Sequence, residues 1–76
     1  MKPAMANYYL NHNAQQNGDH EVHMAPCVTV SSFIVSNMEY LGSFASCHSA
    51  VNEARRRHLF WKINGCYFCS APCHTT

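Results

Sequence analysis

The stretch HEVHMAPC, His20 to Cys27, carries two histidines and a cysteine directly after the turn-like residues QNGD. His20 and His23 are three residues apart, whereas the zinc helix of a metalloprotease, H-E-x-x-H, needs two histidines four residues apart on one helical face. The β-branched Val22 after a Gly-Asp turn favours a strand instead. Because residues three apart in a strand point to opposite faces, His20 and His23 are not expected to bind one ion together. The spacing therefore argues against a protease and predicts a strand.

A β-hairpin is predicted from the residues on either side of the turn. Residues 8–12 and 20–24 form its two strands, and the Asn-Gly-Asp run at residues 17–19 supplies the positive φ angles that tight turns need. The stretch CVTVSSFIVSN, residues 27–37, is rich in β-branched side chains but also contains paired serines and ends in Ser-Asn. A further strand and a long connection are both compatible with this stretch.

An amphipathic helix over Cys47 to Arg57 is the clearest element of the sequence. Its least polar positions follow the spacing i, i+3, i+4, i+7 and i+11: Cys47, Ala50, Val51, Ala54 and His58. Ser43 or Ser46 can cap its start, and Glu53 forms an i,i+4 pair with Arg57 in the favourable orientation. We expect this helix to pack its apolar face on a small antiparallel sheet that contains the hairpin, in an α+β fold.

The length of the chain limits how much core it can build. Seventy-six residues make one domain, residues 1–76, in which residues 1–6 and 75–76 are expected to be disordered ends. A domain of this size buries only about 60% of its unfolded surface, so short chains often need a disulfide or a metal ion. Five cysteines and six histidines could supply either one.

The compartment decides between these two kinds of cross-link. The N-terminal residues contain no apolar run of the about 7 to 15 residues found in secretory signals. No segment approaches the about 20 apolar residues that span a membrane. We therefore expect a cytoplasmic protein with reduced thiols and no membrane partner. An odd number of cysteines also fits poorly with a fully paired disulfide framework, so zinc is the expected cross-link.

Two pairs of candidate metal ligands lie far apart in the chain. Cys66 and Cys69 form a C-x-x-C pair that can bind one ion from a single turn, and Gly65 before it relieves crowding of the backbone. His23 and Cys27 form the second pair, where the predicted strand runs into a loop. Three thiolates and one imidazole suit tetrahedral zinc, and four protein ligands leave no coordination position open. The sequence therefore predicts a structural zinc site.

The choice of ligands is not unique. Cys73 or His74 could replace His23, and so could His20 if the register of the hairpin shifts. A chain without metal is also compatible with the sequence, and the residues FWKINGCYFC could form a short hairpin across their Asn-Gly pair. Cys47 lies among alanines and a valine on the helix face, where a cysteine acts as a small hydrophobic residue.

The remaining aromatic, histidine and basic side chains have simple structural interpretations. His12 and His48 are expected at the surface or in hydrogen bonds. Six aromatic and aliphatic side chains are expected in or near the core: Tyr8, Tyr9, Phe44, Leu59, Phe60 and Trp61. A solvated helix face is the favoured explanation for the basic run, which could otherwise support only weak nucleic-acid binding through four residues: Arg55, Arg56, Arg57 and Lys62.

The order of the motifs resembles that of a group of small bacterial proteins without an established activity. In this chain the motifs are HEVHMAPC, EYLGSFASCHSAVNEA and NGCYFCSAPCHT, and the group carries HEVHxxxC, YLGxFxSCxxAVxxA and NGCxxCxxxCHT. The resemblance covers nearly the whole chain from Asn13 onward. One departure is the apolar run VTVSSFIVSN, where the group is expected to have a polar loop that contains proline.

A looser resemblance is to the metal-binding domain of the Ada DNA-repair methyltransferase. That family has a ligand-x-x-x-Cys pair, a Phe and a Ser before an alanine-rich helix, and then a C-x-x-C pair preceded by glycine. The matching positions are His23, Cys27, Phe44, Ser46, Cys66 and Cys69. The resemblance implies a zinc fold with a short sheet and one helix. It does not carry over the methyl-accepting chemistry, because a histidine stands where that family has a cysteine and the spacer between the pairs is longer.

Two functions fit these observations. The first is a non-enzymatic, zinc-stabilised module that binds a protein or a nucleic acid. The second is a reactive-thiol protein in which Cys66 and Cys69 exchange disulfides or a zinc-bound thiolate accepts an alkyl group. A thioredoxin-like C-x-x-C pair would open a helix, whereas this one follows the helix, so the first function is favoured. The four acidic residues form no recognisable hydrolytic pair.

Overall fold

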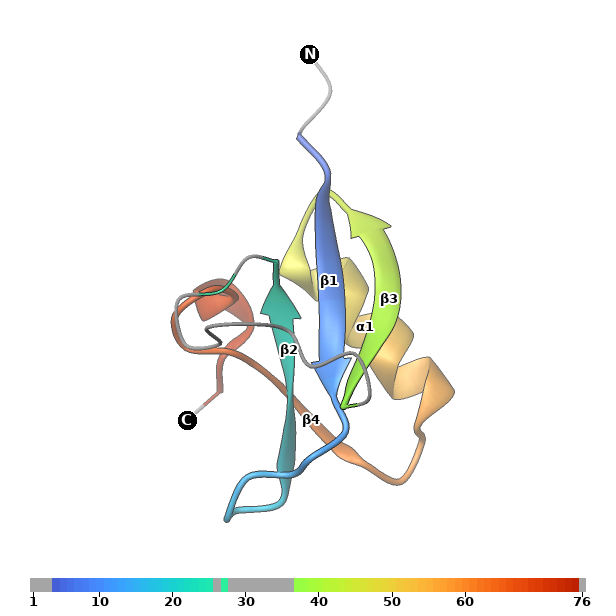
Figure 1. Cartoon of the computed structure of the whole chain (residues 1–76), viewed down its shortest axis with the longest axis vertical. Coiled ribbons are helices and arrows are strands. Elements are labelled where there is room, and N and C mark those ends of the chain that lie inside the picture. Colours follow the sequence, from blue (N-terminus) through green and yellow to red (C-terminus); the bar gives the residue numbers. More distant parts are fainter. Residues whose placement is uncertain (1–3, 26, 28–36, 76) are drawn as a thin grey trace.

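A four-stranded sheet with one helix against it makes up the domain, and this confirms the predicted α+β class (Figure 1). The computed structural model describes residues 4–25, 27 and 37–75. Its elements, in order, are β1 Ala6–Asn11, β2 Asp19–Met24, β3 Met38–Phe44, α1 Cys47–Arg57, β4 Lys62–Gly65 and the short 3₁₀ helix η1 Ala71–Cys73. The undecided stretch at residues 28–36 lies outside the described residues.

The predicted hairpin is present as β1 and β2. These strands pair antiparallel, with Leu10 opposite Val22. Gly18 in the connecting turn has a φ of 90°, and the backbone N–H of Asp19 donates to Oδ1 of Asn17 (2.9 Å). The Asn-Gly-Asp run therefore makes a turn that needs glycine, as expected from the sequence.

The two outer strands were not predicted, and they change the character of the sheet. The strand order is β3-β1-β2-β4, with β3 antiparallel to β1 but β4 parallel to β2. The sheet is therefore mixed and not purely antiparallel as expected. The reason is that α1 carries the chain from one edge of the sheet to the other, which lets β4 enter in the direction of β2. Residues 62–69 accordingly form a strand and a turn, and not a hairpin across Asn64 and Gly65.

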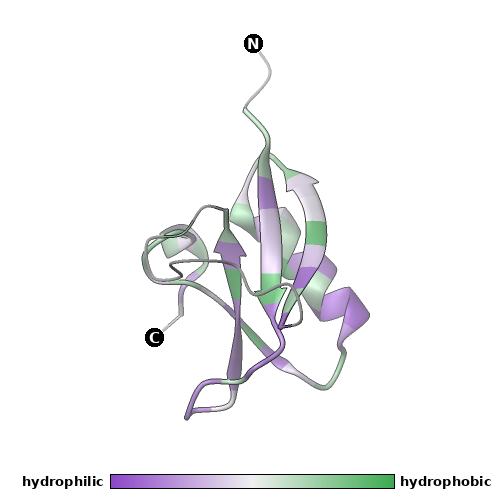
Figure 2. Ribbon diagram, in the orientation of Figure 1, coloured by the Kyte–Doolittle hydropathy of each residue, from purple (hydrophilic) through white to green (hydrophobic). Residues whose placement is uncertain are grey.

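The helix packs on the sheet through the predicted face. α1 begins and ends at the expected residues, and Ser46 occupies its N-cap position without a side-chain cap bond. The buried core combines this face with apolar side chains from all four strands: Tyr8, Leu10, Val22, Leu41, Cys47, Ala50, Val51, Ala54 and Ile63. Green and purple segments alternate around α1 in Figure 2, in keeping with one apolar and one polar face.

Two of the six predicted core side chains are instead exposed. Leu59 and Phe60 are 78% and 98% accessible to solvent. They follow the C-cap residue His58, where the chain leaves the helical face and turns toward β4. Their apolar character predicted burial, but the apolar face of the helix does not extend to them. The other four are buried or half-buried: Tyr8, Tyr9, Phe44 and Trp61.

The part of the chain that the structure describes includes residues of both segments that were expected to be disordered. Ala6 is the first residue of β1. The backbone N–H of Thr75 donates to Oδ1 of Asn64 (2.9 Å), which ties the C-terminal segment to β4. Residues 1–3 and 76 lie outside the part that the structure describes.

A disulfide joins Cys47, the first residue of α1, to Cys73 in η1. The two Cα atoms are 6.2 Å apart, and the sequence separation is 26 residues. The expectation that all thiols are reduced is therefore wrong for this pair, although Cys47 lies in the core as predicted. Sequence spacing could not reveal the pairing, because helix packing brings the two residues together.

Candidate metal centre

The end of β2 supplies the first half of the site. Side chains alternate along a strand, so Val22 points into the helix-covered core while His23 points to the opposite face. His23 is nevertheless only 2% exposed, and Cys27 is 4% exposed. Burial on both faces of β2 at this point means that a second group of residues covers the sheet on the side away from α1.

A turn after β4 supplies that cover and the second half of the site. The backbone N–H of Cys66 donates to the carbonyl oxygen of Val22 (3.0 Å), which places this cysteine beside β2. The N–H of Ser70 donates to the carbonyl oxygen of Cys66 (2.8 Å) and closes the turn. The turn therefore presents Cys66 and Cys69 to the residues at the end of β2. This is the tight knuckle that the C-x-x-C spacing predicts.

Gly65 is required by this close packing. A Cβ atom at this position would lie 2.7 Å from Cβ of Cys73, 2.8 Å from its carbonyl carbon and 2.8 Å from the carbonyl oxygen of Ser70. Carbon atoms in contact normally lie at about 3.5–4.0 Å. The predicted role of the glycine, relief of backbone crowding at the knuckle, is thus observed.

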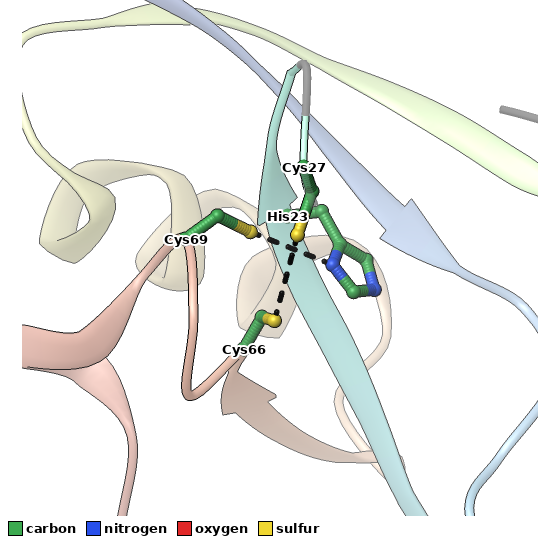
Figure 3. Close-up of side chains that lie close together, drawn as sticks. All are labelled: His23, Cys27, Cys66 and Cys69. Atoms are coloured by element: carbon green, nitrogen blue, oxygen red, sulfur yellow. Dashed lines mark hydrogen bonds between the residues drawn. The ribbon is translucent and has the colours of Figure 1, made fainter. Parts of the chain in front are cut away.

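The four predicted residues converge, as Figure 3 shows. One ligand atom from each of His23, Cys27, Cys66 and Cys69 lies within 4.8 Å of all the others. Sγ of Cys27 is 3.7 Å from Sγ of Cys66, and Sγ of Cys69 is 3.6 Å from Nδ1 of His23. In tetrahedral zinc sites the bonds are about 2.3 Å to sulfur and about 2.0–2.1 Å to nitrogen. Two sulfur ligands of one zinc ion therefore lie about 3.8 Å apart, and a sulfur and a nitrogen ligand lie about 3.6 Å apart. The group could therefore hold a metal ion.

The electrostatics of the metal-free group favour neutral side chains. Burial lowers the pKa of His23, so its imidazole is neutral and can act as a ligand. Burial also raises the pKa of the Cys69 thiol, and the neighbouring Cys27 and Cys66 thiols add to the effect, although the N–H of Met24 at 3.3 Å opposes it. A divalent cation would reverse this balance, because it stabilises the thiolates that burial disfavours.

A carboxylate and an amide lie around the group. Oε1 of Glu21 is 3.8 Å from Nε2 of His23, on the ring atom that does not face Cys69. Metal-bound histidines commonly have such a carboxylate beside the second ring nitrogen. The buried Asn64 donates to Asp19 in the hairpin and accepts from the N–H groups of Gly65 and Thr75. Asn64 therefore ties the knuckle to the first hairpin and to the C-terminal segment.

The alternative ligands have other partners. Cys73 is in the disulfide. Nδ1 of His74 donates to the carbonyl oxygen of Gly65 (3.0 Å), and Nδ1 of His20 donates to the carbonyl oxygen of Asn11 (3.0 Å). None of these three belongs to the converging group in the part of the chain that the structure describes. Cys73, His74 and His20 are therefore set aside as ligands of this site.

Most of the basic residues proposed for nucleic-acid binding contact other parts of the chain. Arg56 and Arg57 both bind Glu53, at 2.7 and 2.6 Å, and Arg57 also binds Glu39 at 2.9 Å. Lys62 donates to a backbone carbonyl in the hairpin turn (2.8 Å). These contacts compete with phosphate binding by the same groups, so the basic run is a weaker candidate interface than its composition implies.

A second group of potential ligands was not recognised in the sequence. It consists of His12, Glu39 and His58, whose ligand atoms also lie within 4.8 Å of one another. The three residues come from three separate parts of the chain and share no local spacing, so no sequence motif marks them. The only available signal was that His58 continues the buried helix face at i+4 from Ala54.

Comparisons of the chain with family models, with curated proteins and with solved structures find no match. Among the described residues, no helix is both long and apolar enough to cross a membrane. What the protein does is therefore inferred from the geometry of its own side chains.

Proposed function

We propose that this chain is a small non-enzymatic zinc-binding module in which one zinc ion holds the knuckle against the end of β2. The main support is the convergence of four side chains: His23, Cys27, Cys66 and Cys69. The distances between their ligand atoms are close to those in a tetrahedral zinc site. Three thiolates and one imidazole favour zinc over magnesium or calcium, which prefer oxygen ligands.

The ion would have a structural and not a catalytic role. Four protein ligands complete a tetrahedral shell, whereas catalytic zinc keeps one position for water or substrate. Three of the four ligands are buried: His23, Cys27 and Cys66. The ion would join segments that are far apart in the sequence. Such a cross-link adds stability that a chain of this length cannot obtain from its small core alone.

We place the interaction surface on the knuckle itself. Tyr67 and Phe68 lie between the two cysteine ligands and are 62% and 64% exposed. Their rings meet edge to face with centroids 5.2 Å apart, and Tyr67 also meets the ring of His74 at 5.4 Å. Zinc would make the backbone on both sides of the pair rigid, and exposed rigid aromatic side chains are typical anchors of protein interfaces. A protein partner is therefore favoured over a nucleic acid.

A reactive-thiol function is the second candidate, because Cys69 borders a cavity. The cavity has a volume of about 370 Å³ and is lined mainly by apolar groups, including Tyr8, Met24 and Pro72. An apolar electrophile placed there would meet the one cysteine of the group that is not fully buried. The raised pKa of Cys69 opposes this function in the absence of metal, since only the thiolate is a good nucleophile.

Native mass spectrometry combined with thiol alkylation tests the zinc proposal. The purified chain should carry one zinc ion, and after the zinc is removed under denaturing conditions its mass should lack two hydrogens, because Cys47 and Cys73 are joined while the other three cysteines are thiols. N-ethylmaleimide should modify these three thiols slowly in the zinc form and rapidly after a strong chelator is added. A chain without zinc that lacks four hydrogens would contradict the proposal. Rapid alkylation of Cys69 in the zinc-loaded chain would instead favour the reactive-thiol function.

Substitution of the knuckle aromatics tests the partner proposal. Tyr67→Ser with Phe68→Ser should abolish capture of a protein partner from an extract of the native cell and leave zinc content unchanged. The matched control is Leu59→Ser with Phe60→Ser, which removes two still more exposed apolar side chains outside the knuckle. The control should retain the partner, and nuclease treatment should have no effect. Equal loss of the partner in both double variants would contradict the assignment of the surface.

A further inference from the structure

His12, Glu39 and His58 form a compact group on the helix-covered side of the sheet. Nε2 of His12 is 2.8 Å from Oε1 of Glu39, and Nε2 of His58 is 2.7 Å from the same oxygen. All three ligand atoms lie within 4.8 Å of one another. Two imidazoles thus converge on one oxygen of one carboxylate.

The topology explains how these residues meet. Glu39 of β3 lies opposite Leu10 of β1, and both side chains belong to the face of the sheet that α1 covers. His12 is two residues beyond Leu10, so strand alternation directs it to the same side. His58 is the C-cap residue of α1. The end of a helix carries partial negative charge, which favours a cation nearby.

Trp61 orients the two imidazoles. It stacks on the ring of His58 with centroids 4.0 Å apart and planes 11° from parallel. It meets the ring of His12 edge to face, at 5.4 Å and 86°. The backbone N–H of Trp61 also donates to the carbonyl oxygen of His58 (3.1 Å). The rings are therefore held by packing as well as by their hydrogen bonds to Glu39.

Arg57 orients the carboxylate and leaves one of its oxygens to the histidines. Nη1 of Arg57 donates to Oε2 of Glu39 (2.9 Å) and to the carbonyl oxygen of Tyr40 (3.0 Å). Oε1 faces the two imidazoles. The carboxylate of Glu39 thus accepts hydrogen bonds from Arg57, His12 and His58. Glu39 is therefore a carboxylate with a fixed orientation, as in metal sites whose ligands are held by neighbouring groups.

We propose that His12, Glu39 and His58 form a second metal site, distinct from the thiolate centre, for a divalent transition metal such as nickel or copper. Metal bonds of about 2.1 Å at right angles place neighbouring ligand atoms about 3.0 Å apart, close to the 2.7 and 2.8 Å observed. Imidazole and carboxylate ligands with such angles are typical of tetragonal nickel and copper sites. Each imidazole would bind through Nε2 and carry its proton on Nδ1, so the metal replaces the two hydrogen bonds to Oε1.

The site differs from the thiolate centre in its accessibility. Three protein ligands leave coordination positions for water or a further ligand, and the side chain of His12 is 44% exposed. Metal can therefore enter from solvent without unfolding. Since the two groups share no residue, a metal at this site would not compete with the proposed structural zinc ion for ligands.

Titration with nickel chloride tests the site, because the chain contains one tryptophan and this residue packs on two of the ligands. The zinc-loaded protein, prepared without a histidine tag, should show saturable quenching of Trp61 fluorescence with one nickel ion per chain. His12→Ala should weaken nickel binding more than about tenfold, since loss of even an outer-shell partner costs about 10- to 100-fold in affinity. Glu39→Gln should act in the same direction.

His48→Ala is the matched control. His48 is an exposed histidine of α1 outside the group, and its loss should leave nickel affinity unchanged. Zinc content and the melting temperature establish that each variant is folded, and His12→Ala replaces a side chain outside the core. Nickel affinity that is the same in His12→Ala and in the unsubstituted chain would overturn the proposal, as would the absence of saturable quenching. Either result would make the group a hydrogen-bonded network only.

Discussion

Cys66→Ser is expected to abolish zinc binding and to unfold the domain. Cys66 is 2% exposed, and its Sγ lies 3.7 Å from Sγ of Cys27. Zinc binding contributes about 10–16 kcal/mol in small zinc-dependent peptides, whereas a domain of this length has a total stability of only about 4–11 kcal/mol. The free energy lost with the ion therefore exceeds what the small core can replace. Far-ultraviolet circular dichroism and zinc analysis of the purified variant measure the effect.

Two controls separate loss of the ion from loss of a buried cysteine. His74→Ala removes a side chain of the C-terminal segment and should leave zinc content unchanged, because His74 contacts Gly65 and Tyr67 and is not one of the four converging residues. Cys47→Ala with Cys73→Ala removes the disulfide and should lower the free energy of unfolding by roughly 3–4 kcal/mol, the value for a closed loop of this length. That variant should still bind zinc. A Cys66→Ser protein with native circular dichroism would show that the core folds without the ion.

Gly65→Ala is expected to have the second largest effect. The added Cβ would lie within 2.8 Å of two Cys73 atoms and of the carbonyl oxygen of Ser70, and two of these three atoms belong to the backbone. Backbone cannot give way as the end of a flexible side chain can, so the knuckle must move away from β4. Overpacking usually costs about 1–3 kcal/mol, and here the same movement also displaces Cys66 from β2. Both a lower melting temperature and a weaker zinc affinity are expected.

Gly18→Ala is the matched glycine control. Gly18 has a φ of 90°, so alanine there is strained by about 1–2 kcal/mol, but a Cβ atom would meet only the end of the Lys62 side chain at 3.7 Å. This variant should lose stability and keep its zinc affinity. Thermal unfolding and competition with a chelating dye measure the two quantities separately. Zinc affinity in Gly65→Ala equal to that in Gly18→Ala would disprove the role assigned to Gly65.

The parts of the fold that could be predicted are those set by neighbouring residues. The Asn-Gly-Asp turn and the alternation in β2 are local features, and so is the 3.6-residue period of α1. Each half of the candidate metal centre is also local, since His23 with Cys27 and Cys66 with Cys69 lie within a few residues of one another. These spacings identified the four residues because the chemistry of zinc restricts which pairs can bind one ion.

The missed features depend on segments that are distant in the chain. β3 was not predicted, and the residues of β4 were considered only as part of a possible hairpin. The exposure of Leu59 and Phe60 depends on where the chain leaves the helix. The Cys47–Cys73 disulfide forms because η1 packs beside the start of α1. No spacing rule connects two cysteines across such a crossover.

The sequence by itself determined the hairpin, the helix and two pairs of candidate ligands, because each arises from contacts within one turn or one strand. Only the tertiary structure decided that the two pairs meet, since the parallel pairing of β4 with β2 brings Cys66 beside Val22 and thus next to His23. It also decided which cysteines form the disulfide and which histidines surround Glu39. The physical reason is that packing α1 across the sheet sets these long-range distances, and packing depends on the whole core and not on any short stretch of residues.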